Sequence, residues 1–94
     1  MSNVRVVEKH QLGADEAKNR VVAFSSFLES KGVKATWRGN SADIKGPFGV
    51  GGDILVTDND VQVNVKLPMM ARAVIKSDKL ENSIRRRLAE KLQG

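Results

Sequence analysis

The stretch that decides the fold is Val61-Gln62-Val63-Asn64-Val65-Lys66-Leu67, in which apolar and polar side chains alternate without a break. Because successive side chains of a strand point to opposite faces, this period of two predicts a strand with one buried face. Pro68 ends it, since proline has no amide hydrogen for a sheet ladder. A polar turn at residues 58–60 precedes the strand.

Further strands are expected upstream, at residues 3–8, 33–38, 41–45 and 53–57. In the second of these, Val33, Ala35 and Trp37 alternate with polar residues and lie on the buried side. Gly39-Asn40 is a turn signal after that strand. Connections this short favour antiparallel neighbours, so residues 33–67 are interpreted as a meander.

Two helices are expected, at residues 14–31 and from about Asp78 towards the C-terminus, where Asp78 is the predicted N-cap. In both, apolar residues fall three or four apart and form one stripe. The stripes are Ala14, Ala17, Val21, Phe24 and Leu28 in the first helix and Leu80, Ile84, Leu88 and Leu92 in the second. Residues 69–75 are expected to form a short helical turn or an irregular link.

These elements predict an α+β fold in the order β-α-β-β-β-β-α, with one antiparallel sheet of about five strands and both helices on its apolar face. A chain of 94 residues is expected to form a single domain over residues 1–94. It contains no cysteine, which excludes disulfides, thiolate zinc sites and a cysteine nucleophile. No apolar run is long enough to span a membrane and no signal peptide is evident, so we expect a cytoplasmic protein.

The positive charge is concentrated near the C-terminus. Residues 1–71 carry nine Lys/Arg against eight Asp/Glu, whereas residues 72–94 carry seven against three. This asymmetry indicates weak binding to nucleic acid or another polyanion, and the candidate contacts are Arg72, Lys76, Arg85, Arg86 and Arg87. A solvated helix face explains most of the pattern, because Glu81 can pair with Arg85 and Arg87 with Glu90.

No catalytic residue, metal site or cofactor is expected. His10 is the only histidine, and its favoured role is to hold a strand-to-helix corner through a hydrogen bond. The glycine-rich segment at residues 46–52 lacks the lysine and the following helix of a phosphate-binding loop. Its glycines are interpreted as permitting positive φ, a bulge or sheet curvature.

Phe48, Met69 and Met70 are the candidate apolar contact surface. An aromatic between Pro47 and Gly49 contacts a partner if it is exposed, and methionine pairs line adaptable binding surfaces. The favoured interpretation, however, is that these residues are structural: Phe48 folds back over an open end of the core, and the two methionines fill gaps in it.

Taken in order, the motifs resemble those of the polyhydroxyalkanoic acid system proteins, a family of small bacterial proteins. They are His10-Gln11-Leu12-Gly13, Glu16-Ala17, Arg20-Val21, Trp37 with Gly39, the loop at residues 46–52 with the strand after it, residues 61–68, and Ile84 with Leu88. The resemblance implies a connection with polyester storage granules and names no activity. It makes a non-enzymatic accessory protein that contacts proteins or the granule surface the leading hypothesis.

Three other possibilities stay open. One is a basic binding module that uses the C-terminal helix. Another is a small-molecule carrier with a cavity beneath that helix, which the short chain leaves little volume to form. In addition, a homodimer through a sheet edge is compatible with any of these functions.

Overall fold

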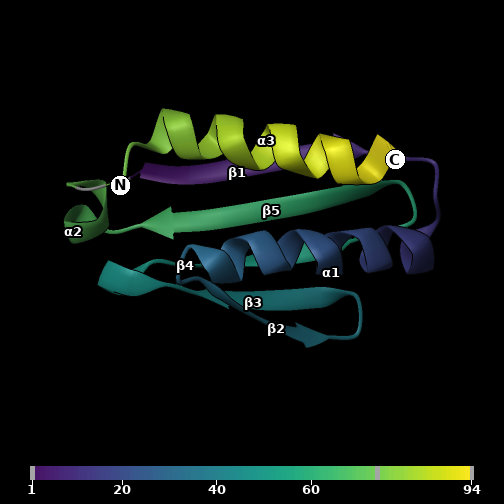
Figure 1. Cartoon of the computed structure of the whole chain (residues 1–94), viewed down its shortest axis with the longest axis horizontal. Coiled ribbons are helices and arrows are strands. Elements are labelled where there is room, and N and C mark those ends of the chain that lie inside the picture. Colours follow the sequence, from purple (N-terminus) through teal and green to yellow (C-terminus); the bar gives the residue numbers. More distant parts are fainter. Residues whose placement is uncertain (1, 74, 94) are drawn as a thin grey trace.

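The computed structural model describes residues 2–73 and 75–93, and within them the chain follows the expected order of elements (Figure 1). The strands are β1 (Ser2–Lys9), β2 (Lys34–Arg38), β3 (Ser41–Lys45), β4 (Gly51–Val56) and β5 (Asp60–Leu67). The helices are α1 (Ala14–Ser30), α2 (Met69–Arg72) and α3 (Ser77–Gln93), with a 3-10 turn η1 (Pro47–Gly49) between β3 and β4.

The five strands form one antiparallel sheet in the order β1-β5-β4-β3-β2. Strands β2 to β5 are consecutive neighbours and make the predicted meander. The N-terminal strand β1 adds to β5, with Val4 opposite Val65 and Val6 opposite Val63. The edge strands β1 and β2 therefore run in the same direction, and α1 carries the chain from one edge to the other.

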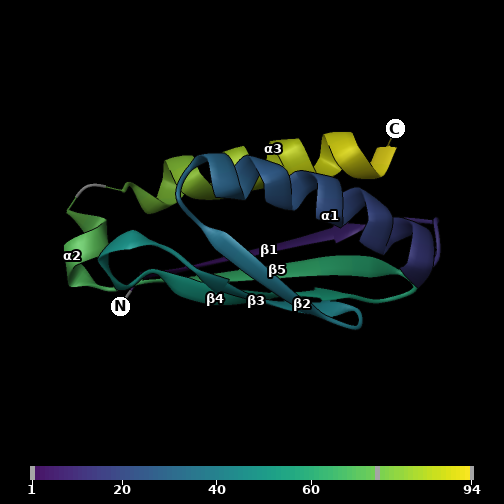
Figure 2. The ribbon, with the colours of Figure 1, turned by 60° about the horizontal axis from the view of Figure 1, so that its bottom comes forward.

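Helices α1 and α3 both cover one face of the sheet, as predicted (Figure 2). The core lies between the two layers, because the inward valines of β1 and β5 are buried together with the helix stripes. Phe24 of α1 and Leu88 of α3 are completely buried. The α+β class is thus confirmed. Among the described residues, no helix has the length and apolar character needed to cross a membrane.

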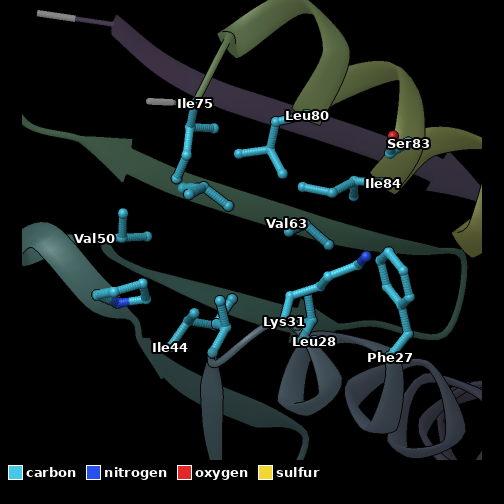
Figure 3. Close-up of a pocket in the computed structure, with 13 residues that line it drawn as sticks. Phe27, Leu28, Lys31, Ile44, Val50, Val63, Ile75, Leu80, Ser83 and Ile84 are labelled. Atoms are coloured by element: carbon cyan, nitrogen blue, oxygen red, sulfur yellow. The ribbon is translucent and has the colours of Figure 1, made fainter. Parts of the chain in front are cut away.

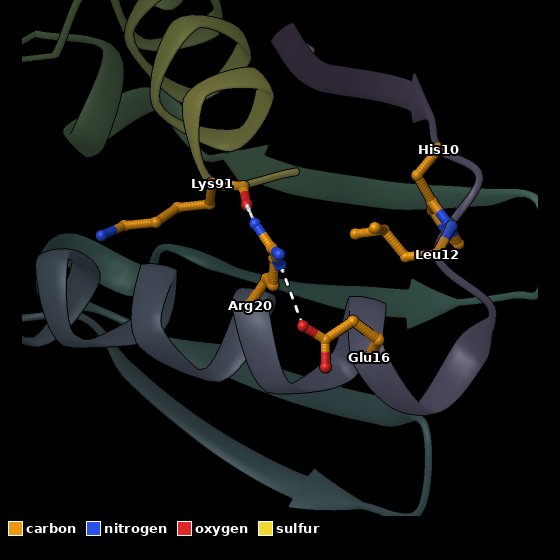
Figure 4. A network of polar contacts seen from close by, with 5 residues as sticks. All are labelled: His10, Leu12, Glu16, Arg20 and Lys91. Atoms are coloured by element: carbon orange, nitrogen blue, oxygen red, sulfur yellow. Dashed lines mark hydrogen bonds and ion pairs between the residues drawn. The ribbon is translucent and has the colours of Figure 1, made fainter. Parts of the chain in front are cut away.

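A cation from α1 ties the two long helices together near the C-terminus of α3 (Figure 4). The Nη1 of Arg20 donates to the carbonyl oxygen of Lys91 at 3.1 Å, and its Nε pairs with Glu16 at 3.2 Å. The last carbonyls of a helix have no partner within the helix, so Arg20 satisfies one of them with a charge of the favourable sign.

Most boundaries agree with the predictions to within one residue, and two of the differences have a structural meaning. Strand β4 begins at Gly51, two residues early, because Gly51 and Gly52 pair with Lys66 and Val65 of β5 although glycine gives no strand signal. Helix α3 begins at Ser77, so Asp78 lies in its first turn and is not the cap.

Gly52 is required by a close backbone approach. A Cβ at this position would collide with the carbonyl oxygen of Asn64 on the neighbouring strand. At Gly51 the nearest atom to such a Cβ is the Ile44 carbonyl oxygen at 3.6 Å, an ordinary contact.

We therefore expect Gly52→Ala to lower the free energy of unfolding by roughly 2–4 kcal/mol, because the β4–β5 ladder must shift. The matched variant Gly51→Ala should change it by less than about 1 kcal/mol. Urea denaturation of both variants measures the difference. Equal losses at the two positions would contradict the close approach.

Candidate binding site at one end of the sheet

Several connections gather at one end of the sheet, where β3 is followed by η1 and β5 by α2 (Figure 1). The turn η1 and α2 are in contact. A Cβ on Gly49 would lie 3.2 Å from the Cγ of Pro68, which immediately precedes α2. Two segments about twenty residues apart in the sequence therefore form one surface.

The side chains of Phe48, Met69 and Met70 are exposed on this surface, with exposed fractions of 51%, 78% and 69%. We refer to these three residues as the apolar end surface. The interpretation that Phe48 covers the core and the methionines fill gaps is wrong. Val50, Leu67 and Ala71, which are close to them in the sequence, are buried in the core, whereas these three side chains remain exposed.

The backbone of η1 determines which way Phe48 points. The amide of Val50 donates to the carbonyl of Pro47 at 3.1 Å, and the amide of Gly46 donates to the carbonyl of Val50 at 2.9 Å. Within this turn Phe48 has φ 60° and ψ 27°, and Gly49 has φ 78°. A left-handed conformation is rare for a bulky residue and costs about 1–2 kcal/mol. Phe48 is exposed in this conformation, whereas Val50, two residues later, is buried.

An apolar pocket of ≈ 330 Å³ lies beside the apolar end surface, between α1 and α3 and above the sheet (Figure 3). Pro47 and Val50 belong to its lining, so the pocket and the surface share the η1 turn. The lining residues are Phe27, Leu28, Lys31, Val33, Ile44, Pro47, Val50, Val63, Val65, Ile75, Leu80, Ser83 and Ile84. A cavity beneath the terminal helix, which the short chain made improbable, is therefore present.

Lys31 and Ser83 are the polar residues of this lining. The ammonium of Lys31 lies 5.9 Å from the ring centroid of Phe27, and the guanidinium of Arg87 lies 4.2 Å from it. Both distances are within the range of a cation–π contact. Among the described residues neither cation has a carboxylate within 4.0 Å. One cation from the C-terminal end of α1 and one from α3 thus lie close to the ring of Phe27, which lines the apolar pocket.

The grouping of Phe27, Lys31 and Arg87 was not predicted from the sequence. One signal was available, because Phe27 lies beside the buried stripe and widens it at the end of α1, and Lys31 follows one turn later. The spacing of apolar residues did not indicate that α1 and α3 would lie far enough apart at this end to leave a pocket between them.

His10 holds the corner between β1 and α1, as predicted (Figure 4). Its Nδ1 accepts a hydrogen bond from the amide of Leu12 at 3.1 Å, and its Nε2 lies 3.0 Å from the carbonyl oxygen of Thr57. A carbonyl only accepts, so Nε2 carries the proton and donates it. Asp58 accepts from the first amide of α1, at Ala14, in the same corner. These bonds link the β1–α1 connection to the β4–β5 turn.

The basic residues of the C-terminal region do not converge. Arg85 pairs with Glu81 at 3.7 Å, as predicted, whereas Arg87 lies over Phe27 and does not pair with Glu90. The prediction for Arg87 failed because an aromatic ring from α1 is packed against that face of α3. Arg86 lines a shallow hollow with Lys79, Asn82 and Ser83. Arg72 lies on α2 and Lys76 just before α3, and polyanion binding by this set stays a prediction.

The glycine-rich segment turns from β3 into β4 and is not followed by a helix, which is the context expected of a structural loop. Among the described residues, no three of the metal-ligating types His, Asp and Glu are grouped in a way that could hold a metal ion.

Comparison with protein families identifies a family to which the chain is similar over most of its length. The model of the family described as putative polyhydroxyalkanoic acid system protein matches residues 4–92. The chain belongs to this family. The match runs from β1 into the last turn of α3, so it covers the apolar end surface and the pocket alike. The family description links the chain to polyhydroxyalkanoate systems and assigns no activity to any residue. No curated protein and no solved structure matches the chain significantly.

We expect His10→Ala to lower the free energy of unfolding by about 1–2 kcal/mol, because two partly buried hydrogen bonds are lost and their partners are left unsatisfied. Gln11→Ala changes an exposed neighbour and should stay within about 0.5 kcal/mol of the parent protein. Chemical denaturation followed by circular dichroism compares the two. A negligible effect of His10→Ala would contradict the role of this corner.

The conformation of Phe48 predicts an unusual order of stabilities. Phe48→Gly should be more stable than Phe48→Ala by about 1 kcal/mol, since only glycine adopts the left-handed region without steric cost. At the exposed helix position Val22 the order should reverse, with Val22→Gly less stable than Val22→Ala by about 1 kcal/mol. Thermal denaturation of the four variants provides the test, and the same order at both positions would rule out the left-handed turn.

Proposed function

We propose that this protein is a non-enzymatic accessory component of bacterial polyhydroxyalkanoate storage, and that it contacts the granule through its apolar end surface. The observation that carries the proposal is the exposure of Phe48, Met69 and Met70 on adjoining segments of a protein whose family is linked to these polyesters. In this proposal the protein is cytoplasmic and granule-associated.

The chemistry of the surface suits an irregular apolar partner. Methionine side chains are flexible and polarisable, so they adapt to a surface without a fixed shape. Phe48 adds a large apolar ring that its backbone holds outward. A polyester of hydroxy acids offers alkyl groups and ester carbonyls, and burying apolar area against it is favourable by about 25 cal/mol per Å².

The exposed apolar side chains elsewhere support this choice of surface. Val7 and Leu55 are 43% and 42% exposed on the open face of the sheet, where Gln62 lies between them in the strand register. They are interrupted by a polar residue, and both are less exposed than Phe48. Single exposed apolar residues of this kind are common on protein surfaces and indicate no partner.

The decisive experiment is localisation in a polyester-accumulating bacterium, with the protein fused to a fluorescent protein. We expect the parent fusion to mark the granules. The variant Phe48→Asn/Met69→Gln/Met70→Gln should be diffuse, because three partly buried apolar contacts of about 1 kcal/mol each amount to a loss of roughly a hundredfold in affinity. Asparagine tolerates the left-handed backbone and glutamine the helix, so the fold is preserved.

The matched control is Val7→Thr/Leu55→Thr, which removes exposed apolar groups from the open face of the sheet. It should mark the granules as the parent does. Diffuse fluorescence of the parent protein beside visible granules would contradict the proposal. An equal loss of granule localisation in both variants would contradict it as well. Co-sedimentation of the purified proteins with polyester particles separates direct contact from recruitment by another protein.

A further inference from the structure

We infer that the pocket between α1 and α3 binds a single acyl chain of medium length that ends in a carboxylate, with its tail inside the pocket and its head group at Lys31. This binding site is distinct from the proposed granule contact, because Phe48, Met69 and Met70 do not line the pocket. Either proposal can therefore hold without the other.

The lining selects an aliphatic tail. Eleven of the thirteen lining residues are apolar, and they come from both long helices, from the strands β3 and β5 and from the connections around them (Figure 3). The floor is formed by Ile44, Val63 and Val65 of the sheet, and the walls by Leu28 of α1 and Leu80 of α3. Ligand sites are typically concave and mostly apolar, with a few polar groups that orient the ligand.

The size of the pocket limits the length of the tail. Its volume of ≈ 330 Å³ is at the lower end of the range for ligand sites. A carbon of a liquid hydrocarbon takes up about as much volume as a water molecule, roughly 30 Å³, so the pocket accommodates a chain of roughly eight to ten carbons.

The charge at the edge selects the head group. Lys31, directly after α1, and Arg87 of α3 both approach the ring of Phe27, and neither pairs with a carboxylate among the described residues. A carboxylate placed beside Lys31 gains a charge-assisted hydrogen bond and the field of the second cation. The hydroxyl of Ser83 adds a neutral donor on the opposite helix. Neutral and cationic amphiphiles gain none of this, and cationic ones are repelled.

The test uses the full chain and three probes of one length, namely decanoate, methyl decanoate and decylammonium, each below its micelle concentration. We expect decanoate to bind best in calorimetry, about tenfold more tightly than the methyl ester, with no binding of decylammonium. The methyl resonances of Ile44, Ile75 and Ile84 should shift with decanoate, while those of Val7 and Leu55 on the open face of the sheet should not.

Variants identify the head-group contact. Lys31→Gln should weaken decanoate binding about tenfold and leave methyl decanoate unchanged. Lys34→Gln removes the same charge from an exposed site outside the pocket and should have no such effect. Ser83→Leu fills the pocket and should abolish binding of both. The variant Phe48→Asn/Met69→Gln/Met70→Gln should bind decanoate normally, which separates this inference from the granule contact.

The carboxylate could belong to a free acid or to the end of a polyester chain. A dimer of 3-hydroxydecanoate, joined by one ester, is therefore used as a further probe in the binding experiment. If it binds as tightly as decanoate, the polymer end is identified as a source of the carboxylate. If it binds more weakly, the free acid is identified as the source. Equal affinity for decanoate and its methyl ester would overturn the head-group assignment. Absence of binding, or binding that Ser83→Leu leaves intact, would overturn the pocket.

Discussion

The structure depends on one geometric constraint, namely that two helices must cover the apolar face of a five-stranded sheet. Neighbouring strands lie about 4.8 Å apart, so five of them are about 19 Å wide, and two packed helices of about 10 Å diameter just match that width. Arg20 holds α1 to the end of α3, where the helices are closed against each other. Near the last turn of α1 and the first turns of α3, only single side chains such as Phe27 and Leu80 cover the apolar face of the sheet. The pocket lies at this place.

The connection at residues 46–52 completes that end of the molecule. It has to bring β4 back beside β3 and also leave room for α2, which contacts it. A tight turn with two successive left-handed residues meets both requirements, and its outward side chain is Phe48. The apolar end surface and the pocket therefore have a common origin, since both lie where a regular two-layer packing comes to its end.

Most of the fold was predictable from the sequence because it follows from periodicity. The alternation at residues 61–67 and the stripe from Ala17 to Leu28 each specify an element and its buried face without reference to the rest of the chain. The role of His10 was predictable for a similar reason, since a lone histidine at a corner has few uses other than hydrogen bonding. The family resemblance read from the short motifs is confirmed by the match over residues 4–92.

What could not be predicted depends on contacts between distant segments. Arg87 lies over Phe27, sixty positions earlier in the chain, and helical spacing alone suggested Glu90 instead. Phe48 precedes a glycine, and local preference assigns a left-handed conformation to the glycine alone. The pocket depends on the distance between two helices that only the packed side chains determine. The sequence thus singled out Phe48, Met69 and Met70 as candidates but favoured their burial, and it gave no indication of the cavity.

The backbone of η1 also affects the conformational entropy that is lost when the protein binds a partner. Flexible loops lose conformational entropy when they bind, at about 1–2 kcal/mol for each residue that becomes ordered. In η1 this ordering has already taken place during folding, since two backbone hydrogen bonds close the turn and Phe48 is held in its rare conformation before any partner arrives. The turn is therefore preorganised for binding. We expect its contribution to the binding free energy to depend mainly on the partner's surface and little on conformational change in the protein.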